Sequence, residues 1–232
     1  MKIALIGDSL TEGRPGVSFI KFLKETFPTV TFDNLGKPGE SVKSLHSRLL
    51  KTKLDSDCDL AFVWIGVNDV YTKLLKVQAQ PVTKNHEEFK DLYEEILNIV
   101  LGSSKNIVAV SPALVGETNN LANKEIKELT AIIESIVNRT ANTSFVNIYS
   151  VFEERLAKVN SSDYISTKVL TVMKDVLFYK KNARIDKLSK KRGLNFTLDG
   201  IHLNSSGARI VAEIDASAID KFFYINHSVI KE

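Results

Sequence analysis

The chain has 232 residues, of which 44% are hydrophobic and 25% charged, so it is long enough to bury one sizeable core and has the composition of a globular domain. Its formal net charge of +3 is too small to imply a nucleic-acid partner by itself. Cys58 is the only cysteine, which excludes an internal disulfide and a cysteine-rich metal site.

Short apolar runs predict five strands, at residues 2–6, 30–34, 60–65, 107–110 and 144–148. Between them, apolar residues recur every three or four positions, which is typical of helices with one buried face. The positions that define four such helices are Phe19, Phe22, Leu23 and Phe27; Val42, Leu45 and Leu49; Phe89, Leu92, Ile96 and Val100; and Ile126, Leu129, Ile133, Ile136 and Val137. This alternation predicts an α/β fold with a doubly wound parallel sheet, in a single domain over residues 1–232.

One basic segment interrupts the alternation. Between residues 155 and 192 the chain has eleven Lys or Arg residues and three Asp residues, a local net charge of +8. An amphipathic helix is expected inside it, because these apolar residues have helical spacing: Val169, Val172, Met173, Val176 and Leu177. The segment, at about residues 158–195, is either a solvated insertion that covers some core or a functional lid whose charge favours anionic esters or surfaces.

Glycines and small polar residues stand where the predicted strands end. They are Gly7, Asp8 and Ser9 after the first strand, Gly36 and Gly39 after the second, Asn68 and Asp69 after the third, and Asp199 and His202 just before the last helix. In an open parallel sheet, ligands bind beyond the carboxyl ends of the strands, so these residues are expected to face one site.

Each of these residues also has an ordinary structural interpretation. Ser9 could be a helix N-cap, and Asn68 with Asp69 could cap a turn. The glycines could only relieve steric crowding in a turn. Asp199 and His202 could form a local hydrogen bond at a helix start.

Together, the same residues meet the requirements of nucleophilic catalysis. A serine nucleophile needs a base to take its proton, and that base needs an acceptor to orient it. Ser9 can supply the nucleophile, His202 the base and Asp199 the acceptor. The backbone amides of Ser9 and Gly36, with the side-chain amide of Asn68, can form an oxyanion hole.

The four short blocks that contain Ser9, Gly36, Asn68 and His202, in this order, resemble those of the SGNH hydrolases, also called the GDSL family. The Ser, Gly, Asn and His that give the family its name match Ser9, Gly36, Asn68 and His202, and the family's Asp three residues before the His matches Asp199. The resemblance extends from residue 3 to about residue 215. It implies a flavodoxin-like three-layer α/β/α sandwich with a five-stranded parallel sheet, and hydrolysis of esters or thioesters with no metal and no organic cofactor.

The sequence therefore predicts a carboxylic ester hydrolase that forms an acyl-enzyme on Ser9. An O-acyltransferase with the same triad is one alternative, and a non-catalytic module that binds an anion is another. The expected partner is a small-molecule acyl ester, and no nucleic acid or transmembrane segment is expected. The N-terminal apolar run is too short for the core of a signal peptide, so a cytoplasmic location is expected.

Overall fold

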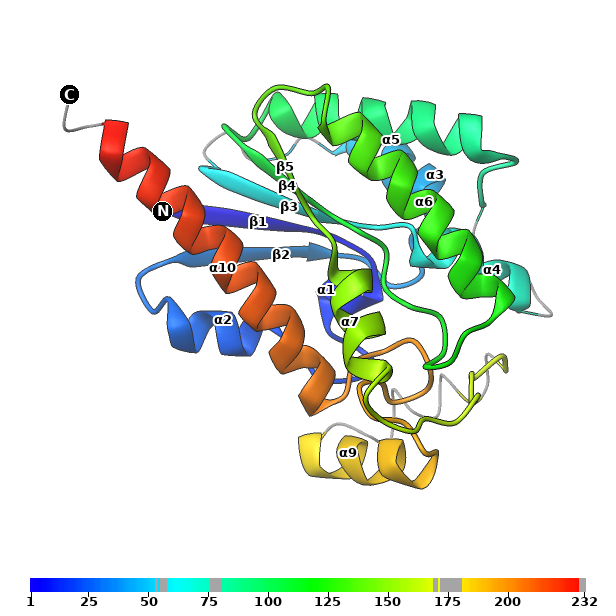
Figure 1. Cartoon of the computed structure of the whole chain (residues 1–232). Coiled ribbons are helices and arrows are strands. Elements are labelled where there is room, and N and C mark those ends of the chain that lie inside the picture. The colour runs from blue at the N-terminus through cyan, green and yellow to red at the C-terminus, as the bar shows by residue number, and fades with distance from the viewer. Residues whose placement is uncertain (53, 55–57, 76–80, 169–170, 172–180, 230–232) are drawn as a thin grey trace.

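The computed structural model describes residues 1–52, 54, 58–75, 81–168, 171 and 181–229, with the backbone alone from 225 to 229. Its centre is a five-stranded sheet in the order β2-β1-β3-β4-β5, with every neighbouring pair parallel (Figure 1). The strands are β1 (Lys2–Gly7), β2 (Thr31–Gly36), β3 (Leu60–Trp64), β4 (Ile107–Val110) and β5 (Thr143–Val146). The predicted parallel sheet and its flavodoxin-like topology are confirmed.

Helices cover both faces of this sheet and give the predicted three layers. One face carries α3 (Val42–Lys51), α5 (His86–Leu101) and α6 (Leu121–Val137), and α3 and α6 both pack on α5. The opposite face carries α2 (Ile20–Thr26) and the long α10 (Ser205–Val229), which contact each other. Because helices lie on both faces, the three inner strands β1, β3 and β4 are almost wholly apolar and buried.

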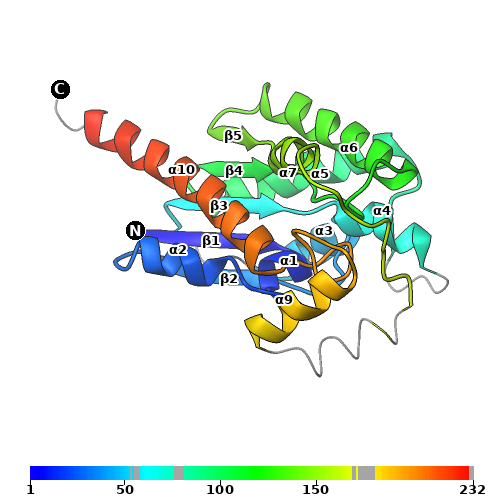
Figure 2. The same cartoon turned by 60° about the horizontal axis from the view of Figure 1, so that its bottom comes forward.

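Three other helices lie near the carboxyl ends of the strands (Figures 1 and 2): α1 (Ser9–Glu12), α4 (Val67–Leu74) and α9 (Asn182–Lys191). A further helix, α7 (Ile148–Leu156), follows β5 directly. Its N-cap is Asn147, whose side chain accepts a hydrogen bond from the Ser150 amide at 3.0 Å. The last strand therefore ends at Val146, two residues before the predicted boundary at residue 148, because Asn147 starts a helix.

The basic segment is described in part. The five apolar residues predicted to form its amphipathic face, between positions 169 and 177, lie outside the described residues. The described part contains α9, which packs on the structure through Ile185 and Ser189 and exposes most of its charged side chains. In the parts of the chain that the structure describes, no helix has both the length and the apolar character that crossing a membrane requires.

Candidate active site

Ser9 lies at the first turn after β1, beyond the carboxyl end of an inner strand. The strand ends at Gly7, where an added Cβ would come within 2.3 Å of both the Thr11 hydroxyl oxygen and the Trp64 carbonyl oxygen. Only a glycine permits this close approach of β1, β3 and α1. Asp8 then caps α1, because its Oδ1 accepts a hydrogen bond of 2.9 Å from the Leu10 amide. The Ser9 amide has no hydrogen-bond acceptor among the described residues, and it is the first N–H of that helix.

His202 and Asp199 come from a tight turn just before α10. Thr197 and Leu203 form an antiparallel bridge at the base of this turn, and the Leu198 amide donates to the His202 carbonyl at 2.6 Å. Inside the turn, Asp199 Oδ1 accepts from the His202 amide at 2.9 Å and from the Ile201 amide at 3.1 Å. Its other oxygen, Oδ2, lies 2.8 Å from His202 Nδ1.

The turn brings His202 to Ser9 across 193 positions of sequence. His202 Nε2 lies 3.1 Å from Ser9 Oγ, so Ser9, His202 and Asp199 form one continuous chain of hydrogen bonds. The three residues are 5%, 4% and 0% exposed, so this chain is shielded from bulk water. A hydroxyl, an imidazole and a carboxylate in this order can remove a proton from the hydroxyl and stabilise the resulting imidazolium.

The electrostatics of Asp199 fit that arrangement. Burial alone would raise its pKa, but the adjacent His202 charge and the hydrogen bonds from the His202 ring and from the His202 and Ile201 amides outweigh burial. The net effect lowers the pKa of Asp199, so the group stays a carboxylate that can orient the imidazole.

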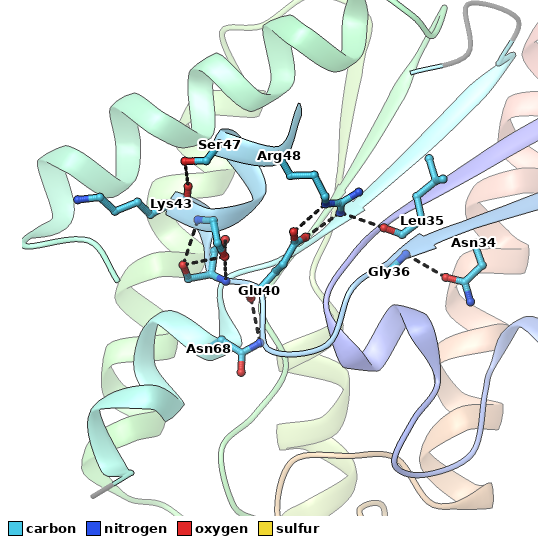
Figure 3. Close-up of polar contacts among 10 residues, drawn as sticks. Asn34, Leu35, Gly36, Glu40, Lys43, Ser47, Arg48 and Asn68 are labelled. Carbon is cyan, nitrogen blue, oxygen red and sulfur yellow. Dashed lines mark hydrogen bonds and ion pairs between the residues drawn. The ribbon is translucent and has the colours of Figure 1, made fainter. Parts of the chain in front are cut away.

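Asn68 lies on the first turn of α4, directly after β3. Gly66 precedes this helix with φ of +117°, a conformation that favours glycine and turns the chain from the strand into the helix. Asn68 Nδ2 donates to the Glu40 carbonyl oxygen at 2.9 Å and to Asp8 Oδ2 at 3.1 Å. Figure 3 shows the first of these bonds, which ties α4 to the loop after β2.

That loop is held in place by an ion pair between a buried Glu40 and a partly exposed Arg48, which the sequence did not reveal. The Glu40 side chain is 2% exposed, and both of its oxygens accept from Arg48 of α3, from Nε and from Nη2, at 2.7 Å each (Figure 3). Arg48 Nη2 also donates to the Leu35 carbonyl at 3.0 Å. This bidentate pair connects the end of β2, the loop and α3, and it fixes the carbonyl that Asn68 contacts.

The Gly36 amide, which the sequence assigns to the oxyanion hole, already has a hydrogen-bond acceptor in the structure. Gly36 is the last residue of β2, and its amide donates to the Asn34 side chain at 3.0 Å, on the side of the loop away from Asn68 (Figure 3). Gly39, three residues later, has φ of +78°, and its amide has no hydrogen-bond acceptor among the described residues. Gly39 also precedes Glu40, whose carbonyl contacts Asn68. The Gly39 amide is thus available as a donor, whereas the Gly36 amide is bonded to Asn34.

Two more buried carboxyl groups lie beside these residues. Burial raises the pKa of Asp8 to about 7, against the opposing effects of the Leu10 amide and His202; Asp69 and Glu40 raise it further. Burial likewise raises the pKa of Asp69 to about 7, although its Oδ2 accepts from the Val42 amide at 2.9 Å. Among the described residues, no three His, Cys, Asp or Glu side chains gather in a way that could hold a metal ion.

Comparisons with known proteins agree with this architecture. The family model of the GDSL-like lipase/acylhydrolases matches residues 3–214, so the chain belongs to that family. The protein is therefore a carboxylic ester hydrolase. The comparison with curated proteins finds no match.

Solved structures of similar fold cover nearly the whole chain. A catalytic mutant of Axe2, an acetylxylan esterase from Geobacillus stearothermophilus, has a TM-score of 0.66 at 17% identity, over 92% of this chain and 91% of its own. The acetyl xylan esterase AlAXEase has a TM-score of 0.67 at 19% identity, over 94% and 100%. LAE5, an α/β hydrolase from the metagenome of Lake Arreo in Spain, has a TM-score of 0.65 at 16% identity, over 94% of each chain. Identities this low show the shared fold.

Proposed function

We propose that this esterase works through an acyl-enzyme on Ser9. The observation that carries the proposal is the unbroken hydrogen-bonded chain from Ser9 Oγ through the His202 ring to the buried Asp199 carboxylate. His202 Nε2 takes the Ser9 proton as Oγ attacks the ester carbonyl, and it then gives that proton to the departing alcohol. A water molecule activated by the same ring releases the acyl group and restores Ser9.

Three donors stabilise the oxyanion of both tetrahedral intermediates. They are the Ser9 amide, the Gly39 amide and the Nδ2 group of Asn68, with Gly39 in the role that the sequence assigned to Gly36. The first two N–H groups have no acceptor among the described residues, so they can bind an oxyanion without giving up another bond. Asn68 is already placed by its bond to the Glu40 carbonyl, which the Arg48 ion pair fixes.

The solved relatives support this assignment of roles and suggest a substrate class. Catalytic mutants of Axe2 replace a serine, an aspartate and a histidine by alanine, with the last two three residues apart, as Asp199 and His202 are here. Axe2 and AlAXEase are both acetylxylan esterases. We therefore take short acyl chains, acetyl first, as the substrates of this protein.

The charge on α9 adds a preference for anionic esters. Exposed cations of this helix are Arg184, Lys187, Lys190 and Lys191, and none has a carboxylate partner among the described residues. The helix packs on the turn that carries His202, because Ser189 Oγ donates to the Thr197 carbonyl at 2.6 Å and Arg192 Nη1 donates to the Leu198 carbonyl at 2.9 Å. Figure 2 shows α9 near α1 and the carboxyl ends of the strands, so the charge of this helix lies beside the proposed site.

Kinetics on a panel of acyl esters test the proposal. Ser9→Ala and His202→Ala should each lower kcat by several orders of magnitude, and the double variant should be little worse than either, because the two residues act as a unit. Additive losses, or near wild-type turnover by Ser9→Ala, would refute the roles. Asp199→Asn should lower kcat less than His202→Ala does, because the base remains.

Adding an acceptor alcohol and analysing the products distinguishes an acyltransferase from a hydrolase.

A further inference from the structure

Glu117 is a buried carboxylate outside the proposed triad and oxyanion hole. It lies in the loop between β4 and α6 and is 3% exposed. In the described part of the chain, no Lys, Arg or His side chain forms an ion pair with it. A buried carboxylate without a cation is costly unless hydrogen-bond donors surround it.

Five donors surround this carboxylate, and four of them belong to one short segment. Oε1 accepts from the Phe196 amide at 2.8 Å, the Thr197 amide at 2.7 Å and the Thr197 hydroxyl at 2.7 Å. Oε2 accepts from the Asn195 amide at 2.7 Å and from Ser161 Oγ at 3.1 Å. One side chain therefore holds three consecutive backbone amides of the 195–197 segment in a fixed arrangement.

This segment is the base of the turn that carries Asp199 and His202. Thr197 Oγ1, which donates to Glu117, also accepts from the Gly200 amide at 3.2 Å. The neighbouring Gly116 amide donates to the Gly200 carbonyl at 2.6 Å. Glu117 and Gly116 thus contact the turn at its base and next to Asp199.

The loop that carries Glu117 is itself fixed to a long helix. Asn123, in the first turn of α6, accepts from the Val115 amide at 2.8 Å and donates to the Thr118 carbonyl at 2.9 Å. Asn120 caps the same helix by accepting from the Asn123 amide at 2.8 Å. Hydrogen bonds therefore connect α6, through the loop that carries Glu117, to the turn before α10.

We propose that Glu117 is a positioning residue of the active site, which acts through Thr197 to hold the Asp199–His202 turn where His202 meets Ser9. This inference rests on the proposed function for its catalytic consequence. Loss of these bonds lets the turn shift, and a shift of about 1 Å in a catalytic group can cost about a hundredfold in rate. A merely structural anchor would lower stability without changing the His202–Asp199 contact.

A set of four variants tests the proposal: Glu117→Gln, Thr197→Val, Thr197→Ser and Asp59→Asn. The glutamine presents an NH₂ to donors that need an acceptor, and the valine removes the hydroxyl that links Glu117 to Gly200, whereas the serine keeps it. Asp59→Asn is the control for stability, because it removes a carboxylate bonded to the Lys2 amide and to Lys105 at the amino end of β3.

The readouts are kcat and KM, the melting temperature, and the low-field proton NMR signal of the His202 Nδ1–H bonded to Asp199. Glu117→Gln and Thr197→Val should lower kcat at least about tenfold, leave KM within about twofold, and weaken or abolish the signal. Thr197→Ser and Asp59→Asn should keep both kcat and the signal, even where Asp59→Asn melts at a lower temperature.

Unchanged kcat and an unchanged signal in Glu117→Gln would overturn the proposal. If that variant does not fold, a Thr197→Val that matches Thr197→Ser in kcat and signal overturns it instead. The NMR signal does not depend on turnover. Loss of the signal in Glu117→Gln and Thr197→Val supports the positioning role even if the wild type hydrolyses no ester. That absence of hydrolysis by the wild type would contradict the proposed function alone.

Discussion

Asp8 Oδ2 accepts a hydrogen bond of 3.1 Å from Asn68 Nδ2, so the residue before the proposed nucleophile contacts the side chain of a proposed oxyanion donor. The second hydrogen of that amide is bonded to the Glu40 carbonyl at 2.9 Å. An oxyanion at this site must therefore compete with Asp8 for one N–H of Asn68. The contact places a buried carboxyl group, with its pKa raised to about 7, next to the reaction centre.

The raised pKa of Asp8 predicts a pH-dependent cost to stability. Between about pH 4 and pH 7 the folded protein holds the proton of Asp8 while the unfolded chain has lost it, so the contribution of Asp8 to the free energy of unfolding falls as pH rises through this range. Asp8→Asn removes that dependence, so the variant should gain about 2 kcal/mol relative to the wild type between pH 5 and pH 8.

Urea unfolding of both proteins at the two pH values measures this difference. Asp215, whose pKa burial also raises, acts in the same direction in both proteins and cancels in the comparison. A constant difference in the free energy of unfolding across this range would show that Asp8 is already ionised in the folded protein at pH 5.

Removal of the Asn68 amide should slow the reaction without weakening substrate binding. We expect Asn68→Ala to cost about 3 kcal/mol of transition-state stabilisation, on the order of a hundredfold in kcat, with little change in KM. If Asn68 only capped α4, the Asn68→Ala variant would instead have a lower melting temperature and an unchanged kcat. Measuring kcat and melting temperature on the same preparation decides between these roles.

The charge of α9 should affect anionic substrates alone. Replacing Lys187, Lys190 and Lys191 by glutamine should raise KM for an anionic ester and spare a neutral ester of the same acyl chain. The difference should shrink as salt approaches about 0.5 M, because these side chains are exposed and screened.

A matched control replaces three exposed lysines outside α9, namely Lys24, Lys51 and Lys221. It changes the net charge by the same amount. If both triple variants raise KM for the anionic ester equally, the effect comes from overall charge, and α9 has no role in substrate preference.

The parallel sheet and the meeting of distant blocks could be predicted because they follow from local patterns. Apolar runs indicated the strands. Because the carboxyl ends of parallel strands lie at one edge of the sheet, Ser9 and Asn68 were expected to lie close together. His202 stands before the last helix and not at a strand end, so its contact with Ser9 is expected from the base that a serine nucleophile needs.

The details of the loops could not be predicted in this way. The choice between Gly36 and Gly39 depends on where β2 ends and on which amide Asn34 engages, and both glycines satisfy the same local pattern. Glu40 and Glu117 stand in polar loops where a carboxylate is normally solvated. Their burial depends on Arg48 and on the 195–197 segment, which only the folded chain brings near.

Covalent labelling by a fluorophosphonate tests the central claim most directly, because the reagent traps a serine only when a base and an oxyanion hole activate it. Mass spectrometry of the digested adduct should find one modified site, at Ser9, with labelling abolished in Ser9→Ala and strongly slowed in His202→Ala. Labelling at another residue, or equal labelling of the wild type and Ser9→Ala, would contradict the account.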